Sequence, residues 1–280
     1  MIILPDIDPR IFTLSVFGTE LAVHWYAMSY IVGFMLVIAG SKFITMRSDL
    51  WYGRNTNITA NIMEDFIFFA CISALIGGRI GYVLLYSLTY YIHYPLEIFM
   101  IWRGGMSFHG GFAGCVIACI ILKLRLKIKF LDMTDIAALL TPPSLFLGRI
   151  AIFINQELWG HPSTLPWSVV FPIDPLQIPR HPSQLYESIL EGLLHTVILW
   201  GIVIYGKGLK YPGLLSGVFC LWYGISRITI EFFREPDQHI GFAATILEIP
   251  ISRGQIFSIP LIIVGSILIA RALELRKVIN

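Results

Sequence analysis

Seven long apolar runs, separated by short polar segments, dominate the sequence. The clearest is Leu21–Gly40, which contains no Asp, Glu, Lys or Arg. A helix of about 20 apolar residues crosses the hydrocarbon core of a bilayer. Only helices and closed barrels satisfy all their backbone hydrogen bonds there. Because the runs are too long for barrel strands, the sequence predicts membrane-spanning helices.

The other six predicted spans follow along the chain. They are Ile62–Tyr86, Gly104–Leu122, Thr134–Gln156, Leu185–Tyr205, Tyr211–Phe233 and Gln255–Ala270. A short apolar stretch, Tyr90–Trp102, leaves counts of six or eight open. Only 14% of the 280 residues are charged, whereas about 25% is usual in soluble domains. We therefore expect an all-α polytopic membrane protein with about seven transmembrane helices, forming a single integral membrane domain over residues 1–280.

Lys and Arg are distributed unevenly between alternate loops. One side receives Lys42, Arg47, Arg54, Lys123, Arg125, Lys127, Lys129, Lys207, Lys210, Arg271, Arg276 and Lys277. The other side receives only Arg10, Arg103, Arg180, Arg234 and Arg253. Since cytoplasmic loops carry the excess of Lys and Arg, the N-terminus is predicted outside and the C-terminus in the cytoplasm.

The connection between the fourth and fifth spans differs from the others. Its prolines are Pro162, Pro166, Pro172, Pro175, Pro179 and Pro182, a density that excludes a helix. Its aromatic residues Trp159, Trp167 and Phe171 favour the membrane surface. We expect residues 157–184 to form a proline-rich external loop at that surface.

Cysteine and charge usage argue against several kinds of partner. Cys71, Cys115, Cys119 and Cys220 all lie in apolar stretches without a Cys-x-x-Cys pair, so neither a metal site nor a disulfide is predicted. The formal net charge of +2 is nearly balanced and gives no basic surface for nucleic acid. We expect no metal, no cofactor and no nucleic-acid partner.

Three arginines lie inside predicted spans: Arg79, Arg149 and Arg227. A charge at the centre of a membrane helix costs at least about 2.5–3.5 kcal/mol. Pairing with nearby glutamates to hold helices together is one explanation. Three arginines at similar depth, with an excess of positive charge, favour an anionic ligand instead. The planar guanidinium suits phosphate because it donates two parallel hydrogen bonds and stays protonated.

The sixth span carries a polar row. Tyr223, Arg227 and Glu231 are spaced by four residues and share one helix face, and Arg234 follows seven residues after Arg227. Such a row is expected to face a cavity rather than lipid, with Glu231 orienting or partly neutralising Arg227.

A second row lies on the fifth span. Glu187, Glu191 and His195 are also four residues apart, so they share a helix face. The glutamates are candidates for the counter-charge of the arginines, and a helix-interface position is an equal alternative for His195.

A histidine stands between two glycine pairs in Gly104–Gly111. The glycines allow the backbone to bend or to approach a ligand closely. His109 accepts a proton near neutral pH, which few other side chains do. The sequence therefore favours His109 as a general base near the external membrane boundary.

Together these motifs resemble the prolipoprotein diacylglyceryl transferase family, in order and over nearly the whole chain. The matching segments are His24–Tyr26, Gly77–Tyr82, Gly104–Gly111, Gly148–Arg149, Phe153–Asn155, Glu157–Gly160, Arg180–Glu187 and Glu231–Asp237.

The resemblance implies a multi-pass enzyme of the bacterial inner membrane, with seven helices and its active site toward the external side. Such an enzyme moves the diacylglyceryl group of phosphatidylglycerol to the thiol of a prolipoprotein lipobox cysteine. The products are a thioether and glycerol phosphate, in the first step of lipoprotein maturation. The implied partners are phosphatidylglycerol, the lipobox peptide and membrane lipid.

The resemblance also suggests roles for individual residues. His109 would activate the thiol, and Arg149 and Arg227 would hold the departing phosphate charge. Tyr223 would either support His109 or donate to the phosphate. The residues expected to bind the lipid or shape its site are Tyr26, Arg79, Arg149, Ile152, Asn155, Glu157, Gly160, Arg227, Glu231 and Arg234.

One position departs from the family pattern. After the arginine the family usually has Gly or Ala, then Asn, then Phe, whereas this chain has Ala151, Ile152 and Phe153. Ile152 shares the helix face of Arg149, so an amide is lost beside the predicted phosphate site. Three accounts are open: a divergence compensated elsewhere, a paralogue of reduced activity, and a deliberate variant.

Two rival functions use the same residues. An anionic-lipid transporter would also need intramembrane arginines, but no repeat is evident, and the polar residues gather near one membrane face rather than at the midplane. The other rival is a catalytically impaired lipid-binding variant, which the replacement at Ile152 favours. Release of a headgroup product separates the enzyme from both.

Overall fold

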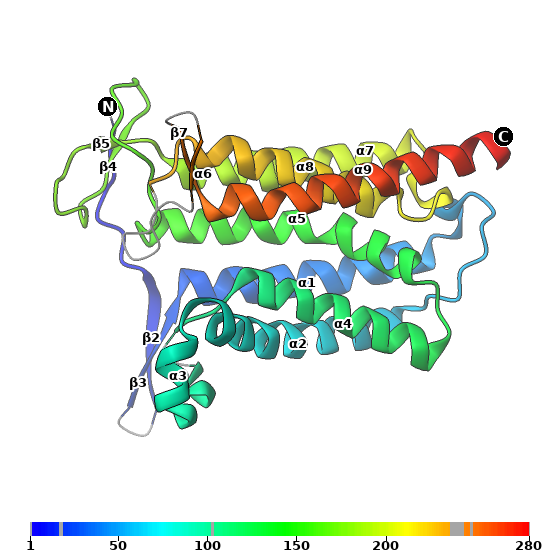
Figure 1. Ribbon diagram of the computed structural model, residues 1–280, viewed down its shortest axis with the longest axis horizontal. Helices are drawn as coiled ribbons and strands as arrows, with labels where there is room; N and C mark the ends of the chain where they lie inside the picture. The colour runs from blue at the N-terminus through cyan, green and yellow to red at the C-terminus, as the bar shows by residue number, and fades with distance from the viewer. Residues whose placement is uncertain (1, 17–18, 102–103, 236–243, 247–248, 280) are drawn as a thin grey trace.

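The computed structural model describes residues 2–16, 19–101, 104–235, 244–246 and 249–279. Its main body is a bundle of long helices (Figure 1). The helices are α1 (Trp25–Met46), α2 (Ala60–Tyr86), α3 (Leu88–His93), α4 (Phe108–Leu126), α5 (Phe130–Ile154), α6 (Ser183–Glu187), α7 (His195–Ile204), α8 (Leu214–Glu231) and α9 (Arg253–Ile279). Shorter helical segments are η1 (Ser48–Trp51), η2 (Pro95–Phe99), the π-helical η4 (Ser188–Leu194) and η5 (Gly208–Lys210).

Five helical segments are long and apolar enough to cross a membrane. They are Trp25–Met46, Ala60–Tyr86, Phe130–Ile154, Ser183–Ile204 and Gly254–Val278. The two other predicted spans correspond to α4 and α8, helices of 19 and 18 residues in the same bundle. The prediction of a mostly helical polytopic membrane protein is confirmed, and a count of seven spans stays a prediction.

Small sheets add to the helices. Strand β4 (Val169–Val170) pairs in parallel with β1 (Ile2–Ile3) and antiparallel with β5 (Pro179–Arg180). Strands β2 (Arg10–Val16) and β3 (Thr19–His24) form a hairpin, and so do β6 (Ala244–Ile246) and β7 (Ile249–Ile251). All of them lie at the end of the bundle opposite the C-terminus, which we call the head end (Figure 1).

The first membrane helix begins and ends later in the chain than the predicted span Leu21–Gly40. Residues before Trp25 belong to β3, and the helix continues past Gly40 to Met46. The apolar run alone does not show where the strand ends and the helix begins. That boundary depends on the pairing of β3 with β2, which is a contact between separate segments of the chain.

Glycines set the closest helix contacts. A Cβ atom at Gly110 of α4 would lie 2.1 Å from the carbonyl oxygen of Gly77 on α2, and one at Gly114 would lie 2.0 Å from that of Ser73. Between α8 and α9, a Cβ at Gly265 would lie 2.6 Å from the backbone nitrogen of Leu221. These helices approach backbone to backbone, as small residues allow in membranes.

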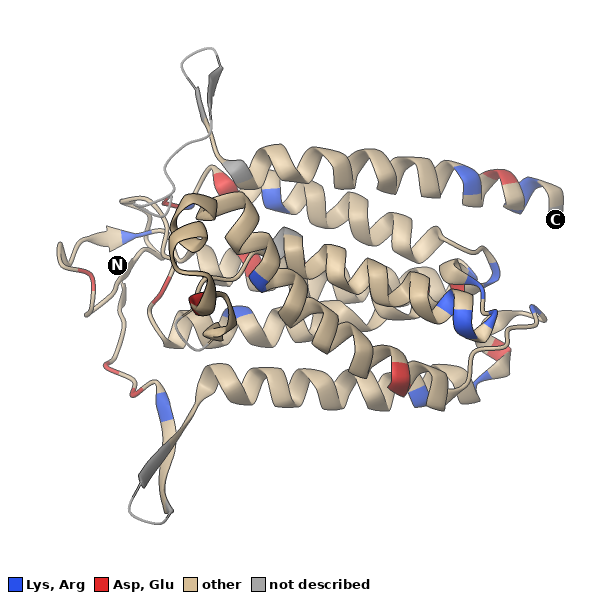
Figure 2. Cartoon of the chain, turned by 60° about the horizontal axis from the view of Figure 1, so that its bottom comes forward, with Lys and Arg blue, Asp and Glu red and all other residues tan. Residues whose placement is uncertain are grey.

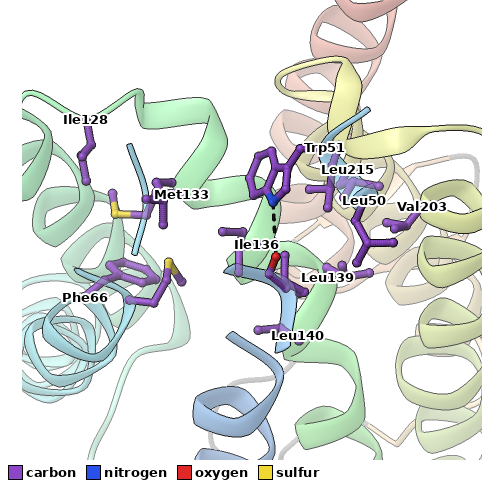
Figure 3. Close-up of a cluster of buried hydrophobic side chains, with 14 of the residues drawn as sticks. Leu50, Trp51, Phe66, Ile128, Met133, Ile136, Leu139, Leu140, Val203 and Leu215 are labelled. Carbon is purple, nitrogen blue, oxygen red and sulfur yellow. Dashed lines mark hydrogen bonds between the residues drawn. The ribbon is translucent and has the colours of Figure 1, made fainter. Parts of the chain in front are cut away.

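A buried apolar core joins the helices (Figure 3). In it, Trp51 donates from Nε1 to the carbonyl of Ile44 at 3.2 Å, and Met133, Ile136 and Leu139 of α5 are fully buried. The outside of the bundle is different, because large apolar side chains such as Phe68, Ile76 and Leu84 of α2 are exposed. An exposed apolar surface of this kind is expected where lipid surrounds the protein.

Lys and Arg gather at the end of the bundle that carries the C-terminus (Figure 2). The head end instead carries the strands and the connection between α5 and α6 (Figure 1). The uneven distribution of positive charge along the sequence thus becomes a difference between the two ends of one bundle.

Candidate active site

The acidic row on the fifth span is brought against α5 by an unusual helix. Segments α6, η4 and α7 are continuous, and the middle one is π-helical, a geometry that often marks functional sites. Gly192 in η4 packs so closely on α5 that a Cβ there would lie 2.6 Å from the Cα of Phe146. This contact sets Glu187 and Glu191 opposite Arg149.

Glu187 is the centre of a buried charge cluster. Its Oε2 lies 3.0 Å from Nη1 of Arg149, and its Oε1 lies 2.6 Å from Nη1 of Arg227 and 3.5 Å from Nη1 of Arg234. A single carboxylate thus contacts three arginines from α5, from α8 and from the residues just after α8.

Two further glutamates complete the cluster. Glu191 accepts a hydrogen bond from Nη2 of Arg149 at 3.0 Å. Glu231 forms an ion pair with Arg227 one turn before it, and lies 4.0 Å from Nη1 of Arg234. Three arginines therefore face three glutamates, so the cluster is formally balanced rather than positive. Both glutamates of the fifth-span row are counter-charges of the arginines.

The arginines and glutamates of the cluster differ in exposure. The side chains of Glu187 and Glu191 are 0% exposed, whereas those of Arg149 and Arg227 are each 15% exposed. Glu187 and Glu191 are therefore the most deeply buried members of the cluster, and the arginines are its more accessible members. A guanidinium has five N–H donors, and the ion pairs of Arg149 engage two of its nitrogens.

Tyr223 and His195 lie next to the cluster. Tyr223 is buried one turn before Arg227 on α8, and its ring stacks on Phe219 with centroids 6.0 Å apart. Phe219 also stacks on His195 at 4.7 Å. His195 is fully buried and therefore occupies an interface position between α7 and α8.

The start of α9 closes one side of the cluster. A Cβ at Gly254 would lie 2.9 Å from Oε1 of Glu231 and 3.4 Å from Nε of Arg227. The sequence interpretation did not single out Gly254. Its flanking Ser252, Arg253 and Gln255 are polar, which is the only local signal at this span boundary.

Arg79 has different partners. It is buried, and it donates to five backbone carbonyls, those of Glu97, Ile98, Met100, Gly104 and Gly105, at 2.5–3.3 Å. Its guanidinium also lies 5.2 Å from the ring centroid of Tyr91. In the described structure Arg79 fastens the segment before α4 to α2, and its predicted contact with a lipid stays a prediction.

A tight turn follows α5. Gln156 and Leu158 have φ angles of 59° and 57°, a left-handed conformation that non-glycine residues adopt rarely. Within the turn, Nδ2 of Asn155 lies 3.5 Å from Oε1 of Glu157, and the Glu157 carbonyl accepts a 2.6 Å hydrogen bond from Gln184. The turn thus connects the end of α5 to α6.

Gly160 connects this turn to the cluster. Its backbone forms a bridge with Arg234, and a Cβ there would lie 2.3 Å from the carbonyl oxygen of Phe233. No side chain fits at that distance. Gly160 therefore fixes the backbone that presents the Arg234 side chain.

Arg180 anchors the loop between α5 and α6 at the head end. It is buried against the ring of Trp159, forms an ion pair with Glu235, and donates from Nε to Asp174 at 2.6 Å. Burial opposes ionisation of Asp174, but the hydrogen bonds from Arg180 and the backbone outweigh it and lower the pKa of this carboxyl. The same two carboxylates raise the pKa of Arg180 against its own burial.

Three other predicted residues lie at the head-side ends of helices. Tyr26 stands in the first turn of α1, and its hydroxyl is 2.9 Å from that of Tyr30. Ile152 is half-buried three residues after Arg149 on α5. His109 lies in the first turn of α4, and its side chain lies outside the described part of the structure.

An apolar hollow of about 300 Å³ opens beside α8. Its lining residues are Leu165, Trp167, His181, Tyr186, Leu190, Thr229, Ile230 and Phe233. Three of these residues, Thr229, Ile230 and Phe233, lie within two positions of Glu231 in the sequence. The described residues contain no group of three or more His, Cys, Asp and Glu side chains that would hold a metal ion.

Comparison with known proteins shows the same family throughout. The model of the family described as prolipoprotein diacylglyceryl transferase matches residues 13–271. A phosphatidylglycerol–prolipoprotein diacylglyceryl transferase of Ruegeria pomeroyi is 42% identical over 285 residues, which cover 96% of each chain. Relatives of the same name from Rhodopseudomonas palustris and Bradyrhizobium diazoefficiens are each 45% identical, covering 93% and 90% of this chain and 88% of their own.

Proposed function

The chain belongs to the prolipoprotein diacylglyceryl transferase family, and we propose that it transfers the diacylglyceryl group of phosphatidylglycerol to the thiol of a prolipoprotein lipobox cysteine. The observation that carries this proposal is the buried cluster in which Arg149 and Arg227 present guanidinium groups in front of Glu187. Guanidinium groups of this kind suit the phosphodiester of the donor lipid.

The reaction forms a carbon–sulfur bond, breaks a carbon–oxygen bond and moves the thiol proton to a base. The cysteine sulfur attacks the glyceryl carbon that carries the phosphate, and the bond between this carbon and its oxygen breaks. The electron pair leaves with glycerol phosphate, and the thiol proton passes to a base. Because the thiolate is the nucleophile and a free thiol has a pKa of about 8.5, a base near neutral pH is useful; we assign this role to His109.

The arginines act on the leaving group. Arg149 and Arg227 donate to the phosphate oxygens and hold the charge that develops there, as preorganised donors do. Tyr223, next to Arg227 on the same face of α8, supports His109 or donates to the phosphate. Glu231 pairs with Arg227, and Arg234 contacts Glu187 and Glu231; both line the lipid site or hold it in shape.

The lipid is held along the head end. We assign Tyr26, Ile152, Asn155, Glu157 and Gly160 to its surroundings, since they lie at the first turn of α1, at the end of α5 and in the following turn. The apolar hollow beside α8 suits an acyl chain.

The proposed topology has seven spans, with α4 and α8 added to the five apolar helices. The Lys- and Arg-rich end of the bundle (Figure 2) faces the cytoplasm. The N-terminus and the active site then face the periplasmic side of a bacterial inner membrane. Residues 157–184 lie on that membrane surface, supported by the exposed apolar side chains of Trp167, Ile173 and Leu176.

The test is a reconstituted transfer reaction. Purified protein in phosphatidylglycerol vesicles is given a peptide with a lipobox cysteine, and mass spectrometry follows the peptide and the released glycerol phosphate. We expect a diacylglyceryl adduct on the cysteine that disappears in His109→Ala. The absence of both the adduct and released glycerol phosphate would contradict the proposal, because a transporter moves phosphatidylglycerol intact and a lipid-binding protein releases nothing.

A further inference from the structure

We propose that Glu187 is a positioning residue of this site: from behind Arg149 and Arg227 it sets both guanidinium groups for a phosphodiester that binds on their exposed side. The inference rests on the proposed function and deepens it, because it assigns a role to a residue that contacts no substrate.

Glu187 contacts the arginines through both of its carboxylate oxygens. Oε2 contacts Arg149 at 3.0 Å, while Oε1 contacts Arg227 at 2.6 Å and Arg234 at 3.5 Å. Each carboxylate oxygen forms an ion pair with a different guanidinium group, so the position of Glu187 links arginines that come from separate parts of the chain. Glu191 and Glu231 contact fewer of them.

Glu187 is buried more deeply than the arginines that it contacts. The side chain of Glu187 is 0% exposed, whereas the side chains of the three arginines that it contacts are 11–15% exposed. A ligand that approaches the exposed side of the cluster therefore meets guanidinium groups first. Glu187 is not in the place of a bound phosphate, and it supports the arginines from the side away from the ligand.

The formal charges of the cluster are balanced. Arg149, Arg227 and Arg234 face Glu187, Glu191 and Glu231. Replacing Glu187 by glutamine removes one negative charge from the cluster and also frees the two arginines to turn. The first effect favours binding of an anionic lipid, and the second misaligns the donors. Binding and turnover are then expected to change in opposite directions.

The experiment separates these effects. Glu187→Gln and Glu187→Asp are compared with the parent in phosphatidylglycerol vesicles, measuring kcat and KM for transfer, melting temperature, and phosphatidylglycerol bound per protein by native mass spectrometry. Glu64→Gln is the matched control because Glu64 pairs with Lys42 on the surface. We expect Glu187→Gln to lower kcat by about 10²-fold, as misplaced groups do, without raising KM or reducing bound lipid.

Glu187→Asp, which keeps the charge on a shorter side chain, should recover about 10-fold of that kcat loss and stay below the parent. The proposal is overturned if kcat of Glu187→Gln stays within about twofold of the parent, or if kcat, bound lipid and melting temperature fall together. Should Glu187→Gln fail to fold, Glu187→Asp decides: a lower kcat at an unchanged melting temperature supports the proposal, and the parent's kcat overturns it.

The lipid-binding measurement keeps this inference separate from the proposed function. If the parent forms no adduct, the proposed function fails, but bound phosphatidylglycerol still tests the role of Glu187. In that case, the proposal is supported if Glu187→Gln binds at least as much phosphatidylglycerol as the parent. It is overturned if Glu187→Gln binds less phosphatidylglycerol at an unchanged melting temperature.

Discussion

Gly192 and Phe146 are in backbone contact: a Cβ atom at Gly192 would lie 2.6 Å from the Cα of Phe146. The contact joins the π-helical segment η4 to α5 and thereby holds Glu187 and Glu191 against Arg149. The geometry of the charge cluster thus depends on a residue that carries no side chain.

The first prediction concerns this contact. Gly192→Ala should destabilise the protein by about 1–3 kcal/mol, as overpacking does, and should lower transfer activity because the two helices separate. The measurements are thermal unfolding in detergent and the peptide-transfer assay. Gly201→Ala in α7 is the control, since a Cβ there meets nothing within 4 Å. If Gly192→Ala and Gly201→Ala have the same melting temperature and the same transfer activity, the contact at Gly192 does not set the geometry of the cluster.

Ile152 gives the second prediction. Its side chain shares the helix face of Arg149 and offers no hydrogen-bond donor. Ile152→Asn should raise turnover, because one preorganised donor is worth about 10²–10³-fold. Ile152→Leu, which adds no donor at the same position, should match the parent. Unchanged turnover in Ile152→Asn would show that no donor is missing at this site.

Arg79 gives the third prediction. Because it donates to five backbone carbonyls before α4, Arg79→Gln should lower the free energy of unfolding by at least about 2 kcal/mol. Bound phosphatidylglycerol should fall less than in Arg149→Gln. A stable Arg79→Gln protein that no longer binds lipid would instead support the substrate contact predicted from the sequence.

The fourth prediction is that the contribution of Asp174, in the loop between α5 and α6, to the stability of the protein depends on pH. Since the pKa of Asp174 is lowered in the folded state, its ionised form contributes stability above the unfolded value of about 3.9. This contribution disappears as the pH falls through the lower, folded pKa. Asp174→Asn should therefore melt below the parent at pH 7, and the gap between their melting temperatures should close in strong acid. A gap that does not depend on pH would contradict this assignment.

The fold was predictable where periodicity and charge act locally. The apolar runs indicated the helices, and the spacing of Arg227 and Glu231 predicted their ion pair. The extended residues before Trp25 were not predictable in the same way, because β3 depends on pairing with β2.

The site was predictable only in part. The sequence identified Arg149 and Arg227 as intramembrane charges, but not that Glu187 contacts both. That contact depends on how α5, α6 and α8 pack, and no spacing within one helix encodes it. Arg79 shows the same limit, since its carbonyl partners lie 18–26 residues away in the chain.

The most direct measurement of the central claim is transfer by Arg149→Gln in phosphatidylglycerol vesicles. Adduct and released glycerol phosphate are quantified beside the parent and beside Arg10→Gln, which changes an exposed arginine paired with Asp8. The account predicts that Arg149→Gln lowers turnover by about 10²–10³-fold, while Arg10→Gln matches the parent. An Arg149→Gln protein that forms adduct at the parent's rate would contradict transfer at this cluster.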